Sequence, residues 1–201
     1  MVPATKNNGE IKLCVDFINL NRCSRKDNYS LPKMEHILQR VTCSARMSMI
    51  NRFSSYNHIS VFLEDRENKT FTTPWGTFMY VKIPFGLMNA RETFQGVMDI
   101  AFIGEKYKFV VIYLDEITMF SKSYQEHYQH LKNVFLKCRK FGLSLNPKKS
   151  LFHMKEGRLL GHIVSAEGVK IDPSRVEAIK TPFLPRSKKE IQSFLGKINF
   201  L

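Results

Sequence analysis

Long apolar runs are absent from this chain of 201 residues. The longest, Phe109–Leu114, falls far short of the roughly 20 residues that cross a bilayer, and residues 1–6 contain no apolar leader. We therefore expect neither a membrane span nor a secretory signal. Cysteine is scarce too, because the four cysteines are widely spaced and accompany no Cys/His ladder. This spacing argues against a structural zinc site and favours buried free thiols in a reducing, intracellular compartment.

Acidic residues are outnumbered: 18 Asp and Glu stand against 31 Lys and Arg, for a formal net charge of +13. No acidic residue occurs from His127 to Lys155, where basic residues recur, and a second basic patch lies between Lys180 and Lys197. Such stripes suit a polyanion, because each neutralised phosphate releases counterions. The charge therefore favours nucleic acid as a partner, with a solvated helix face, an acidic protein or a membrane surface as alternatives.

The apolar residues, 43% of the chain, are enough for a core. Their spacing predicts strands over 11–17, 49–53, 60–63, 70–71, 78–83 and 159–164, with a hairpin over 109–121. Helices are predicted from Pro32 and Pro173, and after the capping residues Asn89, Ser123 and Ser187. Strands and helices mix without regular βαβ alternation, so the sequence favours an α+β fold over a doubly wound sheet.

Two adjacent carboxylates interrupt the apolar hairpin at Asp115 and Glu116. A two-residue hairpin turn needs positive φ and prefers glycine, yet residues 114–117 contain none. A broken local rule often marks a functional site, although a plain polar turn is the alternative. Neighbouring carboxylates at such a tip can hold Mg²⁺. A further ligand from another strand would complete a two-metal site for in-line phosphoryl chemistry.

An ordered set of motifs runs through nearly the whole chain. It comprises Cys14-Val15-Asp16-Phe17, Tyr29-Ser30-Leu31-Pro32, Pro84-Phe85-Gly86-Leu87-Met88-Asn89-Ala90, Thr93-Phe94-Gln95, Tyr113-Leu114-Asp115-Glu116, Leu145-Asn146-Pro147-Lys148-Lys149, Leu159-Leu160-Gly161-His162 and Ser193-Phe194-Leu195-Gly196. Each motif alone is weak, but the ordered set is very specific. It resembles the polymerase domain of reverse transcriptases from long-terminal-repeat retrotransposons of the Ty3/gypsy group.

The resemblance implies an α+β right-hand fold, in which an antiparallel palm sheet is backed by helices. Fingers and palm would interleave over residues 1–165, and the beginning of a thumb would follow over 166–201. The family's polymerase joins deoxynucleoside triphosphates to a primer on an RNA or DNA template, and an intact site uses two Mg²⁺ (or Mn²⁺) ions. No membrane partner is implied, and the oligomeric state is left open.

The same resemblance assigns site residues. It places the catalytic, metal-binding positions at Asn51, Asp115 and Glu116. Tyr56 matches the residue that lies under the incoming sugar and excludes a 2′-hydroxyl group. The other implied nucleotide-binding residues are Lys6, Lys12, Phe85, Gly86, Gln95 and Lys149, and the implied primer-contacting turn is Leu160, Gly161 and His162.

Two of the three metal-ligand positions depart from the family pattern of aspartates. The Asn51 amide can ligate Mg²⁺ but brings no charge, and Arg52 beside it adds positive charge. Glu116 is one methylene longer than aspartate, and a misplacement of ~1 Å can cost ~10²-fold in rate. We therefore expect an impaired polymerase from a truncated, decaying element. A non-catalytic, nucleic-acid-binding relic is the alternative.

Overall fold

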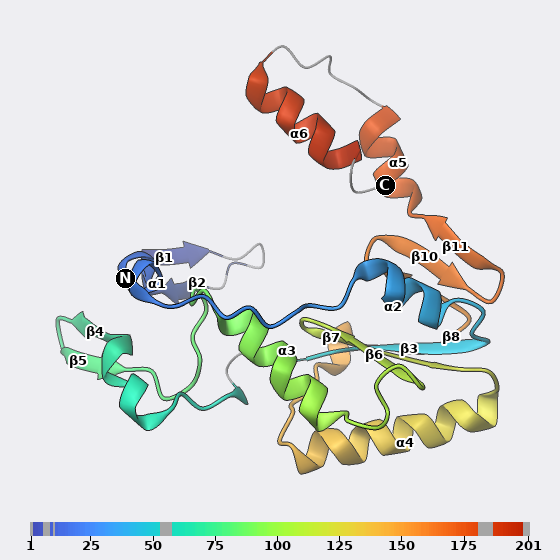
Figure 1. Ribbon diagram of the computed structural model, residues 1–201, viewed down its shortest axis with the longest axis horizontal. Helices are drawn as coiled ribbons and strands as arrows, with labels where there is room; N and C mark the ends of the chain where they lie inside the picture. Colours follow the sequence, from blue (N-terminus) through green and yellow to red (C-terminus); the bar gives the residue numbers. More distant parts are fainter. Residues whose placement is uncertain (1, 6–8, 10, 53–57, 181–186, 199–201) are drawn as a thin grey trace.

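The computed structural model describes residues 2–5, 9, 11–52, 58–180 and 187–198. Lys6 and Tyr56, two of the expected nucleotide-binding residues, lie outside this set. None of the helices in the described residues combines the length and the apolar character that a bilayer span requires. The described residues form the α+β fold that was predicted, with antiparallel sheets and helices packed against them (Figure 1).

The largest sheet has four antiparallel strands and lies between α2 and α4 in the lower right of Figure 1. Its strands, in spatial order, are β6 (Val110–Tyr113), β7 (Glu116–Ser121), β3 (Arg46–Asn51) and β8 (Leu151–Met154). The apolar and β-branched residues of β6 and β7 suit a pleated sheet that is buried on both faces. The hairpin predicted over 109–121 is therefore confirmed, and it lies beside β3 in the middle of the sheet.

Two helices cover one face of this sheet, α3 (Ala90–Ala101) and α4 (Tyr124–Lys140). From α3, Phe94 and Met98 pack with Ile50, Ile112 and Ile117 of the sheet, all fully or almost fully buried. Apolar residues four apart on a helix share one face, so the stripe in the sequence becomes the contact with the sheet.

A second apolar cluster lies on the opposite face of the sheet. There α2 (Met34–Val41) and the sheet formed by β9 (Glu156–Leu159), β10 (His162–Ser165) and β11 (Gly168–Ile171) pack on it. Met49 and Val111 of the four-stranded sheet belong to this second apolar cluster. Because side chains alternate along a strand, residues 51, 113 and 116 project to this same face, where Tyr113 packs against the apolar cluster.

The smaller elements lie mainly to the left of this sheet and above it in Figure 1. One end carries the hairpins β1 (Val2–Thr5) with β2 (Ile11–Cys14) and β4 (Thr70–Thr73) with β5 (Gly76–Met79), the helix α1 (Ile18–Cys23) and the 3₁₀ turns η2 (Leu63–Asp65) and η3 (Glu67–Lys69). The 3₁₀ turn η4 (Pro147–Lys149) precedes β8. The chain continues from β11 into α5 (Pro173–Lys180) and α6 (Lys188–Ile198), which project as an arm.

The helix starts predicted after Asn89, Ser123 and Ser187 are confirmed, but only the two serines cap their helices with a side chain. The Ser123 and Ser187 hydroxyls accept hydrogen bonds from the backbone N–H groups of Glu126 and Glu190, as capping boxes require. Asn89 does not cap α3 with its side chain. Its amide instead donates to the carbonyl of Arg25 and accepts from the N–H of Asp27, so a tertiary contact outcompetes the cap.

Two further expectations are corrected. The strand predicted over 159–164 is broken into β9 and β10, because Leu160 and Gly161 have φ angles of 50° and 78° and form a turn. All four cysteines are free, as expected, but only Cys138 is buried, whereas Cys23 and Cys43 are exposed.

Candidate active site

The ends of β3 and β7 bring together two of the three expected catalytic positions. Asn51 is the last residue of β3 and lies directly opposite Glu116, the first residue of β7. Glu116 also lies opposite Tyr113, the last residue of β6. Directly opposed residues of an antiparallel pair project to the same face. These three half-buried side chains therefore form one row across the sheet, next to Asp115.

The turn that carries Asp115 is strained, as the absence of glycine from residues 114–117 suggested. Leu114 and Asp115 are the two residues between the strands, and Leu114 has a φ of 50°. Positive φ is uncommon outside glycine, asparagine and aspartate, and typically costs ~1–3 kcal/mol. Such a conformation persists only where the surroundings hold it.

Arg52 supports the turn from the side of the sheet that faces α3. Its side chain is only 3% exposed, and its Nη2 donates to the carbonyl of Leu114 at 2.8 Å. The guanidinium lies 3.7 Å from the ring centroid of Phe94, within cation–π distance. The positive charge that Arg52 adds therefore lies under the hairpin, on the side of α3.

Gln95, which the resemblance implies as a nucleotide-binding residue, holds the turn as well. Its side chain is fully buried. Its Nε2 donates to the carbonyl of Ile112, and its Oε1 accepts from the N–H of Leu114 at 3.1 Å. An amide used in this way positions the hairpin and has no open face for a nucleotide in this structure.

Burial makes the electrostatics of the acidic row unusual. Desolvation by burial raises the pKa of Glu116 above its ordinary value, because loss of water disfavours the charged carboxylate. The Oδ1 atom of Asp115 is buried and has no hydrogen-bond partner in the described part of the chain. An acceptor oxygen left in this state fits an oxygen-ligated cation.

The donor set for a metal is nevertheless poorer than the family pattern. No group of three or more His, Cys, Asp or Glu side chains that could hold a metal ion occurs among the described residues. Two carboxylates and the uncharged Asn51 amide fit one hard divalent cation. They fit a pair of such cations poorly, because their summed charge is too small.

The remaining expected residues lie on different elements. The turn η4, which contains the exposed Lys149, lies beside the site, because the N–H of Asn146 donates to the carbonyl of Asn51 at 2.9 Å. Phe85 and Gly86 are exposed in the loop before α3, and Lys12 belongs to β2. Leu160, Gly161 and His162 form the turn between β9 and β10, on the sheet that packs over β3.

Sequence reasoning missed three residues behind the hairpin. Asp99, Lys106 and Tyr29 form a cluster that reaches the hairpin through Gln95. The spacing of four residues between Gln95 and Asp99 on one helix was the available signal. Tyr29 lies on a distant segment, so its contact could not be derived from spacing.

Comparisons with known proteins agree with this geometry. The family model "Reverse transcriptase (RNA-dependent DNA polymerase)" matches residues 5–164. The chain therefore belongs to the reverse transcriptase family. It is 33% identical, over 96% of its length, to a retrovirus-related Pol polyprotein from transposon 297 of Drosophila melanogaster. It is 30% identical, over 98%, to the transposon Tf2-3 polyprotein of Schizosaccharomyces pombe. These relatives bear out the resemblance to retrotransposon Pol polyproteins.

The chain spans only 18% and 15% of those two polyproteins. Among solved structures it is similar to a foamy viral protease-reverse transcriptase in complex with double-stranded DNA, with a TM-score of 0.89 and 21% identity. That similarity covers 98% of this chain and 35% of the other, and it confirms the palm-and-fingers fold.

Proposed function

We propose that this chain is an RNA-directed DNA polymerase domain with impaired catalysis, which binds a primer annealed to an RNA or DNA template. The observation that carries the proposal is the row formed by Asn51 and Glu116 beside the strained turn with Asp115. The family's polymerase chemistry needs carboxylates at this place, and this chain keeps two of three. The proposal includes the division into fingers and palm over 1–165 and the start of a thumb after 165.

Asn51 and Glu116 of the row, together with Asp115, would have roles in metal binding. Asp115 and Glu116 would hold Mg²⁺ or Mn²⁺ through their carboxylates, and Asn51 would add its amide oxygen. A bound ion would lower the pKa of the primer hydroxyl and offset charge on the triphosphate. Glu116 must be ionised to bind, so its raised pKa makes binding weaken as the pH falls.

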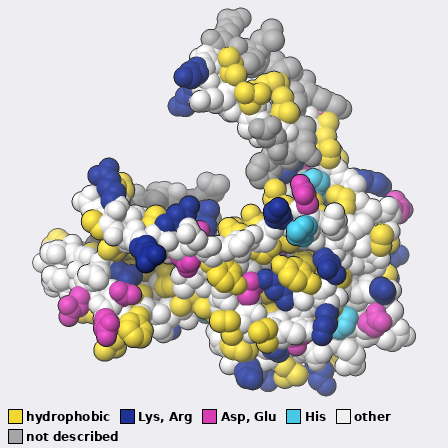
Figure 2. Space-filling view, viewed as in Figure 1, with side chains coloured by type: hydrophobic (Ala, Val, Ile, Leu, Met, Phe, Trp, Pro, Cys, Tyr) yellow, Lys and Arg dark blue, Asp and Glu magenta, His cyan; other side chains and the backbone are white. Residues whose placement is uncertain are grey.

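Deoxynucleoside triphosphates would meet Lys6 and Lys12 of the expected fingers and the exposed Lys149 beside Asn51. Figure 2 shows Lys and Arg side chains on both sides of the notch between the β1–β2 hairpin and the arm of α5 and α6. The foamy viral structure described above holds double-stranded DNA, and a second foamy viral protease-reverse transcriptase of similar fold was solved with an RNA/DNA hybrid. Both features support nucleic acid as the partner.

Impairment follows from two changes at the reacting centre. Removing one group that stabilises developing charge typically costs ~10²–10³-fold in rate. The longer Glu116 side chain displaces its carboxylate by about one bond, on the order of a further 10²-fold. We therefore expect slow extension, which the variant Asn51→Asp/Glu116→Asp accelerates by at least ~100-fold.

Primer extension on RNA and DNA templates, in Mg²⁺ and then in Mn²⁺, tests this. The double variant with Asp115→Asn added is the control, and it should not extend. Equal extension by the natural chain and the double variant would refute the impairment. A folded double variant that binds primer–template without extending it would refute the polymerase assignment.

The net charge of +13 supports a second candidate, a nucleic-acid-binding relic without catalysis. Filter binding of a labelled duplex at increasing salt, read together with primer extension, tests this candidate. A relic that keeps its basic surface should lose affinity steeply with salt, because bound phosphates release counterions, and neither the natural chain nor the double variant should extend a primer.

A further inference from the structure

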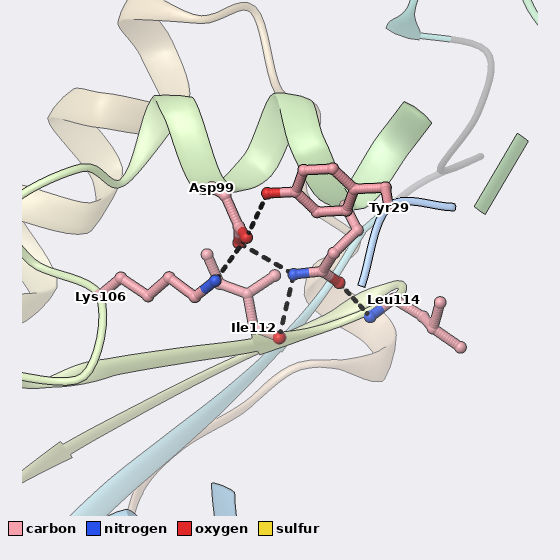
Figure 3. Close-up of polar contacts among 6 residues, drawn as sticks. Tyr29, Asp99, Lys106, Ile112 and Leu114 are labelled. Carbon is pink, nitrogen blue, oxygen red and sulfur yellow. Dashed lines mark hydrogen bonds and ion pairs between the residues drawn. The ribbon is translucent and has the colours of Figure 1, made fainter. Parts of the chain in front are cut away.

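We infer that Asp99 and Tyr29 are positioning residues for the turn that carries Asp115, and that they act through the side-chain amide of Gln95. Figure 3 shows the contacts, which run from Lys106 and Tyr29 through Asp99 and Gln95 to the backbone of the hairpin. The positioning itself does not depend on the proposed function. Its importance for catalysis does.

Gln95 bonds to the hairpin at two points. Its Nε2 donates to the carbonyl of Ile112 at 3.3 Å, and its Oε1 accepts from the N–H of Leu114 at 3.1 Å. The two atoms thus fix the end of β6 and the first residue of the turn. Leu114 is the residue with positive φ, so the bond to its N–H opposes relaxation of the strain.

This clamp works in only one orientation of the amide. The oxygen and nitrogen ends of a glutamine amide have nearly the same shape. A flipped Gln95 would place NH₂ against the N–H of Leu114 and oxygen against the carbonyl of Ile112, which removes both bonds. An ionised carboxylate is an acceptor only. Because Asp99 Oδ1 lies 3.0 Å from Gln95 Nε2, it selects the bonded orientation.

Asp99 is in turn anchored from two other segments. Lys106, in the loop after α3, forms an ion pair with Asp99 Oδ2, and the side chains of this pair are 18% and 16% exposed. The hydroxyl of Tyr29 donates to the same oxygen at 2.8 Å. The bond to Asp99 is the main reason that the pKa of Tyr29 is raised to about 12, so the phenol stays a donor at neutral pH.

Tyr29 extends the contact to the segment that joins α1 to α2. Its ring lies against α3 at Gly96, where an added Cβ would be 3.6 Å from the ring. A displacement of this segment from α3 would break the bond to Asp99 and loosen the orientation of Gln95. The geometry thus couples the position of residues around 29 to the turn with Asp115.

Hydrogen exchange of backbone amides in the full chain, measured by NMR without substrate or metal, tests this inference. In Asp99→Ala the amide of Leu114 should exchange ~10-fold faster relative to that of Ile117. The reason is that Gln95 loses its hydrogen bond to the charged Asp99, and the Gln95 Oε1 that accepts from the Leu114 N–H is then no longer fixed. Tyr29→Phe, which removes one hydroxyl, should give a smaller change of ~3-fold. Asp99→Glu, which keeps the carboxylate, should restore part of the protection.

Two matched controls are available. Asp65→Asn removes an exposed carboxylate, and Tyr128→Phe removes an exposed phenol. Neither should change the ratio of Leu114 to Ile117 exchange. An unchanged ratio in Asp99→Ala, or equal acceleration of both amides, would overturn the inference. If Asp99→Ala does not fold, Tyr29→Phe decides by the same ratio.

A kinetic arm separates this inference from the proposed function. In the background Asn51→Asp/Glu116→Asp, adding Asp99→Ala should lower kcat for primer extension at least fivefold, with little change in the KM for primer–template. If that background does not extend primers, the polymerase assignment fails while the exchange result still stands. Normal kcat together with faster Leu114 exchange would limit Asp99 to the geometry of the turn.

Discussion

His127 makes the stability of this fold dependent on pH in a range that can be calculated. The side chain is fully buried between α4 and the sheet, where Ser48 Oγ lies 2.8 Å from Nε2 and Ser121 Oγ lies 3.0 Å from Nδ1. Burial, with smaller effects of His153, His130 and Arg46, lowers the pKa of His127 to about 4. The imidazole is therefore neutral in the folded protein at pH 7.

The direction of the effect follows from where the proton binds. The unfolded chain binds it with the ordinary pKa of about 6.5, whereas the folded protein binds it only near pH 4. The stability from neutral His127 is complete above pH 6.5 and is lost as the pH falls toward 4. Between pH 7 and pH 5 the loss is about 2 kcal/mol. His130, whose pKa burial also lowers, acts in the same direction.

Urea unfolding at pH 7 and pH 5 measures this loss. The natural chain should lose about 2 kcal/mol more than His127→Gln, which cannot titrate and keeps polar partners for both serines. His36→Gln reports the effect of removing an exposed histidine. Glu116 acts in the opposite direction, because its raised pKa stabilises the folded state as the pH falls. Its contribution is present in both proteins, so it cancels when the loss of stability of the natural chain is compared with that of His127→Gln. Parallel curves for the two proteins would refute the reasoning.

Three further changes have defined outcomes. Phe94→Ala should cost about 3–5 kcal/mol in urea unfolding, since it opens a cavity and removes the ring under Arg52. Gly161→Ala should lower the thermal midpoint, because φ is 78°, a left-handed conformation that alanine adopts only with strain. Gly196→Ala in α6 should not lower it, because no atom of the described residues lies within 4 Å of an added Cβ. Ser123→Ala should cost about 1 kcal/mol by removing the α4 cap. An unchanged unfolding midpoint in any destabilising case would contradict the corresponding contact.

The convergence at the site was predictable from sequence because it rests on alternation and turn chemistry. The apolar pattern of 109–121 fixed the hairpin, and the missing glycine indicated the strain found at Leu114. The family resemblance supplied the partner strand that ends at Asn51.

Contacts between distant segments were not predictable. Asn89 matched a capping pattern, yet its amide bonds to residues 25 and 27. Gln95 lies in a motif that suggested a nucleotide contact, yet it is buried under the hairpin. In both cases the polar side chain could form hydrogen bonds with several alternative partners, and local sequence spacing does not predict which partner the folded chain selects. The Gln95 carboxamide is buried, so it must find its hydrogen-bond partners inside the protein.

The loop before α3 is tied to α1 by one side chain. Asn21 donates from its Nδ2 to the carbonyl of Gly86 at 2.8 Å, and its Oδ1 accepts from the N–H of Met88 at 2.8 Å. We therefore expect α1 and this loop to move together rather than to hinge against each other. If α1 tilts, both hydrogen bonds require residues 86–88 to move with it, and the exposed Phe85 beside them is displaced as well.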